Sequence, residues 1–211
     1  MTNMRYLSGL LISTCLILTG CTQSLVLEAE SDVPVPLVTK LPLNMGVYYE
    51  DSFSNYIYEE NTEDRPNWSI KLGTSQVDLF NQILPSMFQQ VTPVTGTHEP
   101  SYDGVLVPEV QEVQFALPEE TKTPLYEAWL KYQVHLYDQD GAVIVSWPVT
   151  GYGKSSTEFM KGRDEGLQTA INSAFRDIGA KLSINFSRVP EIRNWMAEKP
   201  GLCETVTGLC P

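Results

Sequence analysis

Basic residues and histidines are scarce in this sequence of 211 residues, which holds 14 Lys and Arg against 26 Asp and Glu, and two His. The net charge of −12 argues against nucleic acid as a partner, because binding to phosphates needs a basic surface. It argues equally against electrostatic attraction to anionic lipid headgroups. Two histidines leave little material for a His-rich metal site, and we expect neither a metal nor a cofactor.

Catalytic motifs are also lacking. There is no Gly-x-Ser-x-Gly sequence, and the two histidines are not placed beside a recognisable nucleophile. The run 151–156 (Gly-Tyr-Gly-Lys-Ser-Ser) ends like a nucleotide-binding P-loop, but Pro148 stands where that motif needs its first glycine. We expect a glycine-rich turn there instead. We therefore expect a protein that is not an enzyme, with a pair of carboxylates for glycoside cleavage left open.

Long apolar runs are missing after the amino terminus. Residues 6–18 are mostly apolar, but thirteen residues of helix cover only about 20 Å, which is short of the ~30 Å hydrocarbon core of a bilayer. A short charged start, a short apolar run and small residues after it are typical of an export leader. The small residues are Thr19 and Gly20, directly before Cys21.

The sequence Leu18-Thr19-Gly20-Cys21 resembles the lipobox of bacterial lipoproteins. The resemblance implies that residues 1–20 are a signal peptide and that Cys21 carries lipid and becomes the mature amino terminus. Three acyl chains would make the anchor effectively permanent. By the same resemblance, Thr22 after the cysteine favours the outer membrane, at its periplasmic face. An uncleaved anchor and an ordinary secretory leader are the alternatives.

Residues 21–36 are predicted to form the lipidated amino terminus and a flexible tether. Prolines and acidic residues interrupt any hydrophobic period, and Val33-Pro34-Val35-Pro36 is expected to be extended. Fifteen extended residues reach at most about 50 Å. This tether would let the following domain stand away from the membrane.

Residues 37–198 are predicted to form a single α/β domain. Strands are expected over 43–49, over 105–117 with a bulge or an edge position at Pro108, and in a hairpin over 126–152. Helices are expected from Ser75 to about Val91, from about 158 or 163 to 186, and after Pro190. A kink or break is expected at Pro85. This order predicts an α+β fold, a two-layer sandwich of a mixed, mainly antiparallel sheet of four to five strands with two main helices on one face.

The hairpin gives the most detailed expectation. A tight turn at Asp140-Gly141 pairs Gln139 with Ala142 and places Val134 opposite Trp147. Eight apolar residues then share the inner face: Leu130, Tyr132, Val134, Leu136, Val143, Val145, Trp147 and Val149. Five residues of interest share the outer face: Trp129, His135, Tyr137, Ile144 and Tyr152.

That outer strip is the candidate site for binding a partner. A strip of aromatic residues is costly in water unless something covers it, and Trp and Tyr dominate contact energy at interfaces. The tether or the chain's own tail, from Trp195 to Cys210, could cover the strip. A partner protein, a second copy of the chain or a ligand are the other candidates.

Residues 199–211 form a tail with two cysteines, Cys203 and Cys210. An exported compartment permits disulfides, and a bridge between these two would close a short loop worth about 2.5 kcal/mol in the chain-entropy model. We predict that bridge. Free thiols and a bridge to another protein are the alternatives.

The order of elements over residues 43–198, together with the lipobox, resembles a group of small envelope domains. They are the lipopolysaccharide-assembly lipoprotein, the amino-terminal domain of the TolB protein and the lipoprotein of curli secretion. The resemblance carries over no catalytic or binding residue. It implies a non-catalytic accessory or assembly component of a Gram-negative envelope complex, with an envelope protein as partner. A binding module for a hydrophobic ligand, an inhibitor of an envelope enzyme and a cell-wall hydrolase are the alternative functions.

Overall fold

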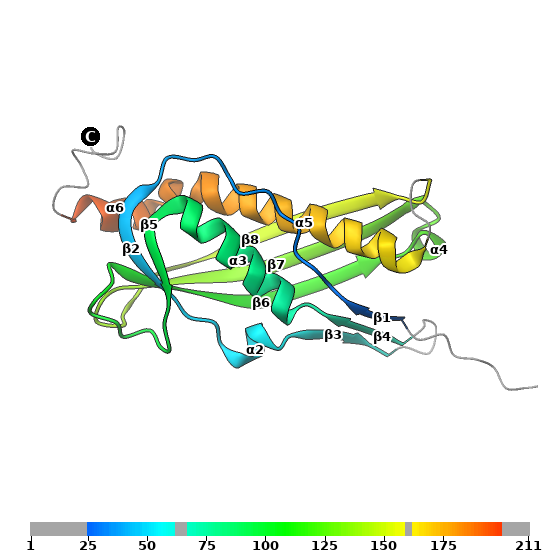
Figure 1. Cartoon of the computed structure of the whole chain (residues 1–211), viewed down its shortest axis with the longest axis horizontal. Coiled ribbons are helices and arrows are strands. Elements are labelled where there is room, and N and C mark those ends of the chain that lie inside the picture. Colours follow the sequence, from blue (N-terminus) through cyan, green and yellow to red (C-terminus); the bar gives the residue numbers. More distant parts are fainter. Residues whose placement is uncertain (1–24, 62–66, 159–161, 200–211) are drawn as a thin grey trace, which may run out of the picture.

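The computed structural model describes residues 25–61, 67–158 and 162–199 (Figure 1). Its strands are β1 (Leu25–Glu28), β2 (Leu41–Val47), β3 (Ile57–Glu60), β4 (Trp68–Lys71), β5 (Phe88–Pro93), β6 (Gly104–Ala116), β7 (Leu125–Tyr137) and β8 (Val143–Ser156). Its helices are α2 (Asp51–Ser54), α3 (Gly73–Met87), α4 (Pro118–Thr121), α5 (Arg163–Asn185), a 3-10 turn (Phe186–Arg188) and α6 (Pro190–Ala197).

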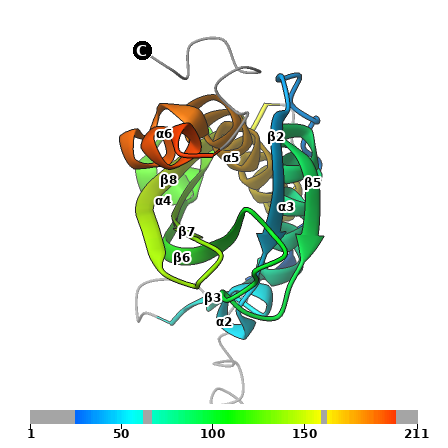
Figure 2. The ribbon, with the colours of Figure 1, turned by 90° about the vertical axis from the view of Figure 1, so that its left-hand side faces the viewer.

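The main sheet has five strands in the order β5-β2-β6-β7-β8. Strand β2 runs parallel to both of its neighbours, whereas β6, β7 and β8 are antiparallel. Helices α3 and α5 pack on one face of this sheet (Figure 1). Seen from one end, the sheet is strongly twisted, with β7 and β8 on one side and β2 and β5 on the other (Figure 2). The predicted α+β class, with a mixed sheet and two main helices on one face, is confirmed.

A second sheet, which the sequence analysis did not predict, contains three short strands in the order β1-β4-β3. Strand β1 pairs in parallel with β4, and the backbone N–H of Ala29 donates to the carbonyl of Lys71 at 3.0 Å. The chain then crosses the helices, as Figure 1 shows, and buries Ala29 and Val33. The prediction of a flexible tether is therefore wrong for residues 25–36, because these residues form a strand and then pack on the domain.

The β7–β8 hairpin has the predicted register over most of its length, with Val134 opposite Trp147. The turn differs from the prediction. Asp138, rather than Gln139, bonds to Ala142, and Gly141 alone in this loop has a positive φ, of 80°. The loop therefore has three residues, and an irregularity between Val143 and Val145 restores the expected register further along. Because of this shift, Val143 is exposed rather than on the inner face.

The glycine-rich run 151–156 is part of strand β8, so the expected turn between strand and helix is wrong. Its glycines let helix α5 approach the strand closely. A Cβ at Gly151 would lie 2.4 Å from the carbonyl oxygen of Ala174, and one at Gly153 would lie 2.0 Å from that of Ala170. These positions are therefore explained by packing rather than by phosphate binding.

A bulge or an edge position was expected at Pro108; the bulge in this strand lies between Val110 and Glu112 instead. Pro108 pairs with Val134 on β7. On the other side of β6, strand β2 pairs only with Gly104–Leu106. Pro108 therefore lies where that side of β6 has no pairing with β2, which explains how the strand tolerates a residue without an N–H.

The core between sheet and helices is filled with large side chains. The rings of Phe53, Phe80 and Tyr132 contact each other with centroids 5.7 to 5.8 Å apart. Their one polar group is satisfied, because the Tyr132 hydroxyl donates to the buried side chain of Gln76 at 3.1 Å. Gln76 in turn donates to the carbonyl of Phe53. This arrangement fixes strand β7 against helix α3.

The predicted helices are present with small differences at their ends. Helix α3 begins at Gly73, and the Ser75 hydroxyl donates to the carbonyl of Leu72. It continues through Pro85 and ends two residues later, so the expected kink or break becomes a helix end. Helix α5 begins at Arg163, and Pro190 opens α6 as predicted. Across the described ranges, no helix is both long and apolar enough to span a bilayer.

Candidate binding groove on the outer face of the long hairpin

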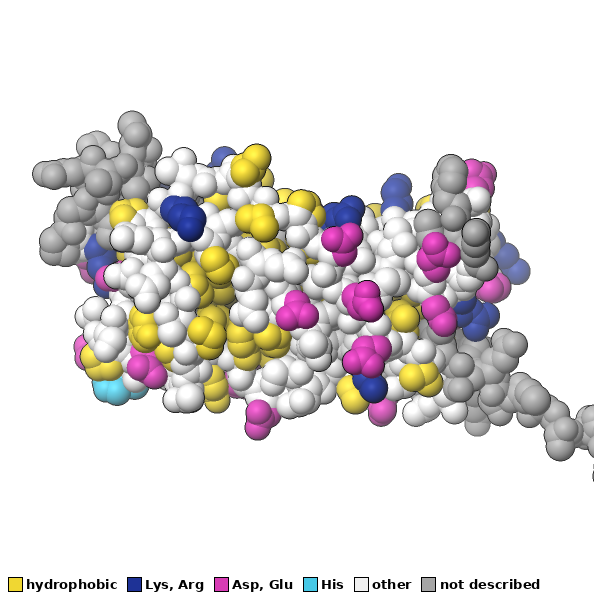
Figure 3. Space-filling model, viewed as in Figure 1, with side chains coloured by type: hydrophobic (Ala, Val, Ile, Leu, Met, Phe, Trp, Pro, Cys, Tyr) yellow, Lys and Arg dark blue, Asp and Glu magenta, His cyan; other side chains and the backbone are white. Residues whose placement is uncertain are grey.

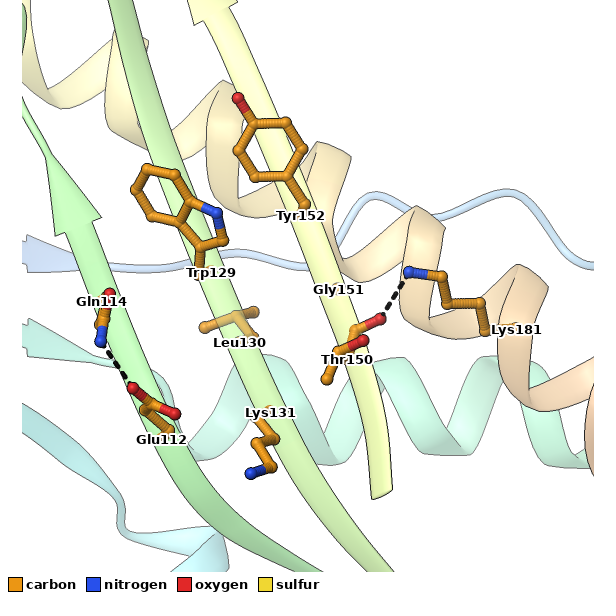
Figure 4. Close-up of a pocket in the computed structure, with 9 residues that line it drawn as sticks. All are labelled: Glu112, Gln114, Trp129, Leu130, Lys131, Thr150, Gly151, Tyr152 and Lys181. Atoms are coloured by element: carbon orange, nitrogen blue, oxygen red, sulfur yellow. Dashed lines mark hydrogen bonds between the residues drawn. The ribbon is translucent and has the colours of Figure 1, made fainter. Parts of the chain in front are cut away.

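The face of β6, β7 and β8 turned away from the helices carries a groove of about 250 Å³, which we call the outer groove (Figure 4). Its position follows from the alternation of the strands, which sends every second side chain to this face. The described residues that line it are Glu112, Gln114, Trp129, Leu130, Lys131, Thr150, Gly151, Tyr152 and Lys181.

One wall of the outer groove is aromatic. Trp129 and Tyr152 are direct partners across β7 and β8, and their ring centroids lie 5.2 Å apart. The two residues remain 37% and 39% exposed. The Tyr152 hydroxyl donates to the carboxylate of Glu127, and this hydrogen bond raises the pKa of Tyr152 above its ordinary value. The phenol is therefore neutral at physiological pH and is held in one orientation.

The opposite rim of the outer groove is polar. The Gln114 amide donates to the carboxylate of Glu112 at 2.5 Å, which keeps both side chains on the rim (Figure 4). Lys131 is the strand partner of Glu112. Within the part of the chain that the structure describes, no ion pair joins Lys131. The groove thus offers a flat apolar surface beside an ammonium group that can bind an acidic group.

The edge of the sheet next to the outer groove is closed by helix α5. Lys181 donates to the carbonyl of Thr150 at 2.9 Å and forms an ion pair with Asp177 at 2.8 Å. Asp177 also accepts the backbone N–H of Tyr152 at 3.0 Å. Pro148, two residues before Thr150, has no N–H to offer. This stretch of β8 is therefore a poor template for pairing with another strand, so we expect a partner to use side chains here.

The five outer residues predicted from the sequence fall into separate places. Trp129 and Tyr152 come together in the outer groove, whereas His135 and Tyr137 lie further along β7, with ring centroids 6.4 Å apart. Ile144 is half-buried and packs against the core, so its assignment to the outer face is wrong. The irregularity between Val143 and Val145 changes the alternation at that point.

Two segments of the chain itself, the tether and the tail from Trp195, were candidates to cover the outer strip. Residues 25–36 of the predicted tether cross helix α5, so this part of the chain is not the cover (Figure 1). At the start of the predicted cover, Trp195 lies beside Gly104, and the Lys199 ammonium lies 5.0 Å from the centre of its ring. The rest of that tail, from residue 200, lies outside the described residues.

A cluster of three polar side chains on the same face was not predicted from the sequence. The Ser146 hydroxyl lies 2.6 Å from Nδ1 of His135, and Nε2 of His135 lies 3.2 Å from the Glu109 carboxylate. The hairpin register already places Ser146 opposite His135, but Glu109 could be placed only with the β6–β7 register. A potential nucleophile (the Ser146 hydroxyl), a base (His135) and an acid (Glu109) therefore lie together, with the base within hydrogen-bonding distance of the other two. Hydrolysis also needs a substrate cleft and donors for an oxyanion, and none of these three residues lines the outer groove.

Three other predicted site residues, Cys21, Cys203 and Cys210, lie outside the described residues. In residues 25–61, 67–158 and 162–199, no group of three or more His, Cys, Asp and Glu side chains is arranged to hold a metal ion.

No family model matches the sequence, and no curated protein matches it significantly. Among solved structures, the chain is similar to a DUF330 protein from Xanthomonas campestris, with 13% identity, a TM-score of 0.45 and coverage of 76% of this chain and 91% of the other. A hypothetical protein from Chlamydia trachomatis matches with 12% identity, a TM-score of 0.39 and coverage of 66% and 95%.

A candidate lipoprotein from Caulobacter crescentus CB15 matches with 13% identity, a TM-score of 0.36 and coverage of 61% and 82%. None of these three descriptions names an activity. With TM-scores below 0.5, the likeness carries no functional argument for this chain.

Proposed function

We propose that this chain is a lipid-anchored, non-catalytic accessory or assembly component of a Gram-negative envelope complex, held at the periplasmic face of the outer membrane. It binds a partner protein through the outer groove. The anchor rests on the sequence Leu18 to Cys21, and the binding role rests on the geometry of the hairpin.

The observation that carries the binding role is the exposed pair Trp129–Tyr152. Two large aromatic side chains in contact, each more than a third exposed, leave apolar surface that a partner can bury. Trp and Tyr are enriched among the residues that dominate binding energy, especially near a polar rim. Lys131 and Glu112 supply such a rim. The groove therefore suits a protein segment with an apolar side chain next to an acidic one.

The alternative of a hydrophobic-ligand carrier receives less support. A carrier needs a deep apolar cavity between sheet and helices, but the rings of Phe53, Phe80 and Tyr132 fill that space. A cell-wall hydrolase needs two convergent carboxylates, and Glu112 is the one acid among the described residues that line the outer groove. The filled core and exposed aromatic pair favour an assembly component.

The anchor is tested by replacing Cys21 with Ser. The wild-type protein should incorporate labelled fatty acid and lose residues 1–20, whereas Cys21→Ser should remain an unlabelled precursor. Equal labelling of the two proteins would contradict lipidation at this residue.

The binding role is tested by site-specific photo-cross-linking in intact cells. A photoreactive amino acid in place of Lys131 should give one discrete adduct, and the same group in place of Val143, which is 55% exposed on the same hairpin, should not. The double variant Trp129→Ser/Tyr152→Ser should abolish the adduct while lowering the unfolding midpoint by only a few degrees. An adduct that survives this double variant would contradict binding at the groove.

A further inference from the structure

The three-stranded sheet lies at the start of the described chain, and none of the helices and strands in the described ranges covers its outer face. The strand register and alternation place six side chains on that face: Val26, Glu28, Ile57, Glu59, Ser69 and Lys71. Val26 is 64% exposed and Ile57 is 44% exposed. Their neighbours on the inner face, Trp68 and Ile70, are fully buried.

Strand β1 is firmly attached to the domain, as are the residues that follow it. Glu30 lies two residues after β1, and its backbone N–H donates to the side-chain oxygen of Gln168 on helix α5 at 3.1 Å. The side-chain amide of Gln168 donates to the carbonyl of Glu30 at 2.7 Å. Arg176 donates to the carbonyl of Asp32 and lies 3.6 Å from its carboxylate. Val33 is buried and faces Gly179. Residues 25–33 of the predicted tether therefore belong to the folded domain.

The link between Cys21 and the domain is consequently very short. Thr22, Gln23 and Ser24 are the only residues between Cys21 and Leu25. Four residue steps span at most about 14 Å even when fully extended. Strand β7 alone has 13 residues, which corresponds to about 43 Å. The domain is therefore much longer than its link, and the link leaves from the end that carries β1 (Figure 1).

We propose that the end of the domain that carries β1 is the part that this protein turns toward the membrane, held near the phospholipid headgroups by the three-residue link. This inference rests on the proposed lipid anchor at Cys21. The loop between β7 and β8, at the other end of the long axis, points away from the membrane (Figure 1). The outer groove is nearer the membrane end, because Trp129 lies four residues from Leu125, where β7 begins.

Charge does not hold this surface to the lipid. The outer face of the sheet carries Glu28 and Glu59 against Lys71, and the chain has a net charge of −12. On the face shown in Figure 3, most of the Asp and Glu side chains lie in the half of the molecule that contains β1. The orientation therefore comes from the length of the link, and the protein without its lipid should not bind vesicles.

The experiment uses the lipidated protein in vesicles of phosphatidylethanolamine and phosphatidylglycerol that contain nitroxide-labelled headgroups. Cys203→Ser and Cys210→Ser remove the thiols of the tail, and a single fluorophore is attached at Glu59→Cys or at Asp140→Cys. Both positions are exposed, and they lie at opposite ends of the domain. We expect headgroup quenching at position 59 to be at least twice that at position 140.

A variant with a longer link tests whether the orientation comes from the short link or from direct adhesion of the domain to the lipid. A flexible Gly-Ser insert of about 20 residues between Ser24 and Leu25 adds a root-mean-square reach of about 25 Å. Quenching at position 59 should then fall to the level at position 140.

The outcomes distinguish this inference from the lipid anchor. Protein that does not float with the vesicles contradicts the anchor and, with it, the orientation. Protein that floats but is quenched equally at positions 59 and 140, or is unaffected by the spacer, contradicts the orientation alone. Flotation of Cys21→Ser protein would show that the domain adheres without the link and would also overturn the proposal.

Discussion

The two faces of the β7–β8 hairpin both carry aromatic residues, but these residues have different environments. On the inner face, Tyr132, Val134 and Leu136 are at most 1% exposed, and helices α3 and α5 cover them. On the outer face, Trp129 and Tyr152 are more than a third exposed. An apolar side chain on a strand therefore contributes to stability mainly where a second layer of the fold covers it. Where no layer covers it, the side chain indicates a binding surface.

The largest expected effect tests the inner face. Leu136→Ala removes a fully buried side chain and leaves a cavity, so it should lower the free energy of unfolding by about 2–5 kcal/mol. Trp129→Ser, on the other face, should cost about 1 kcal/mol or less. Chemical denaturation of both variants measures the difference. Equal losses would mean that something covers the outer face as closely as the helices cover the inner one.

A glycine variant tests how closely the helix layer fits the hairpin. Gly153→Ala places a methyl group 2.0 Å from the carbonyl oxygen of Ala170, so strand and helix must separate. We expect a loss of about 3 kcal/mol, the upper part of the usual range for overpacking. Gly96→Ala is the matched control, because a Cβ there has no atom within 4 Å. A neutral Gly153→Ala would show that β8 and α5 are not in the close contact described.

The buried Tyr132 allows the inner face of the hairpin to be tested through the pH dependence of the free energy of unfolding. Burial raises the pKa of Tyr132 above its ordinary value of 10. The folded state thus favours the neutral phenol, and this contribution is complete below pH 10 and is lost as the pH rises toward the folded-state pKa. Between those values, the free energy of unfolding should fall by about 1.4 kcal/mol per pH unit for this group.

Tyr132→Phe removes that group and should give a smaller decrease of stability above pH 10. At pH 7 the variant leaves the side-chain oxygen of Gln76 without its donor and should cost about 1–3 kcal/mol. Denaturation at several pH values compares the two proteins. Parallel curves for the two proteins above pH 10 would contradict a raised pKa for Tyr132.

The smallest effect concerns the outer face. Glu127→Gln removes the charged acceptor of the Tyr152 hydroxyl and should lower the pKa of Tyr152 toward its ordinary value. Because both residues are at the surface, we expect little change in stability. NMR of protein with ¹³C-labelled tyrosine can follow this titration. An unchanged Tyr152 titration would mean that the hydrogen bond does not form in solution.

The sequence was most informative where alternation continues over many residues. The inner face of the hairpin from Leu130 to Leu136 and the pairing of Trp129 with Tyr152 both follow from a period of two. The turn was mispredicted because a three-residue loop and a later irregularity give the same register further along the strand. Ile144 was misplaced for the same reason.

The sequence pattern could not predict the short strands or the contacts between residues that are far apart in the sequence. Strands β1, β3 and β4 have four residues each, which is too few for a period to be recognised. Val33-Pro34 was expected to be extended, and the burial of Val33 depends on helix α5, where it lies near Gly179. The polar rim of the outer groove depends on the bulge after Val110, which brings Glu112 opposite Lys131. Contacts of this kind can be predicted only when the pairing between separate strands is known.

The contacts of the amino-terminal segment also determine the order in which the fold can be completed. Glu30 and Gln168 are 138 positions apart, and Asp32 and Arg176 are 144 apart. During synthesis from the amino terminus, residues 25–36 emerge early, but their partners on helix α5 emerge much later. Contacts between distant positions form slowly because a long loop must close. Residues 25–36 are therefore among the last to reach their final place, so any processing at the amino terminus meets them before they are covered.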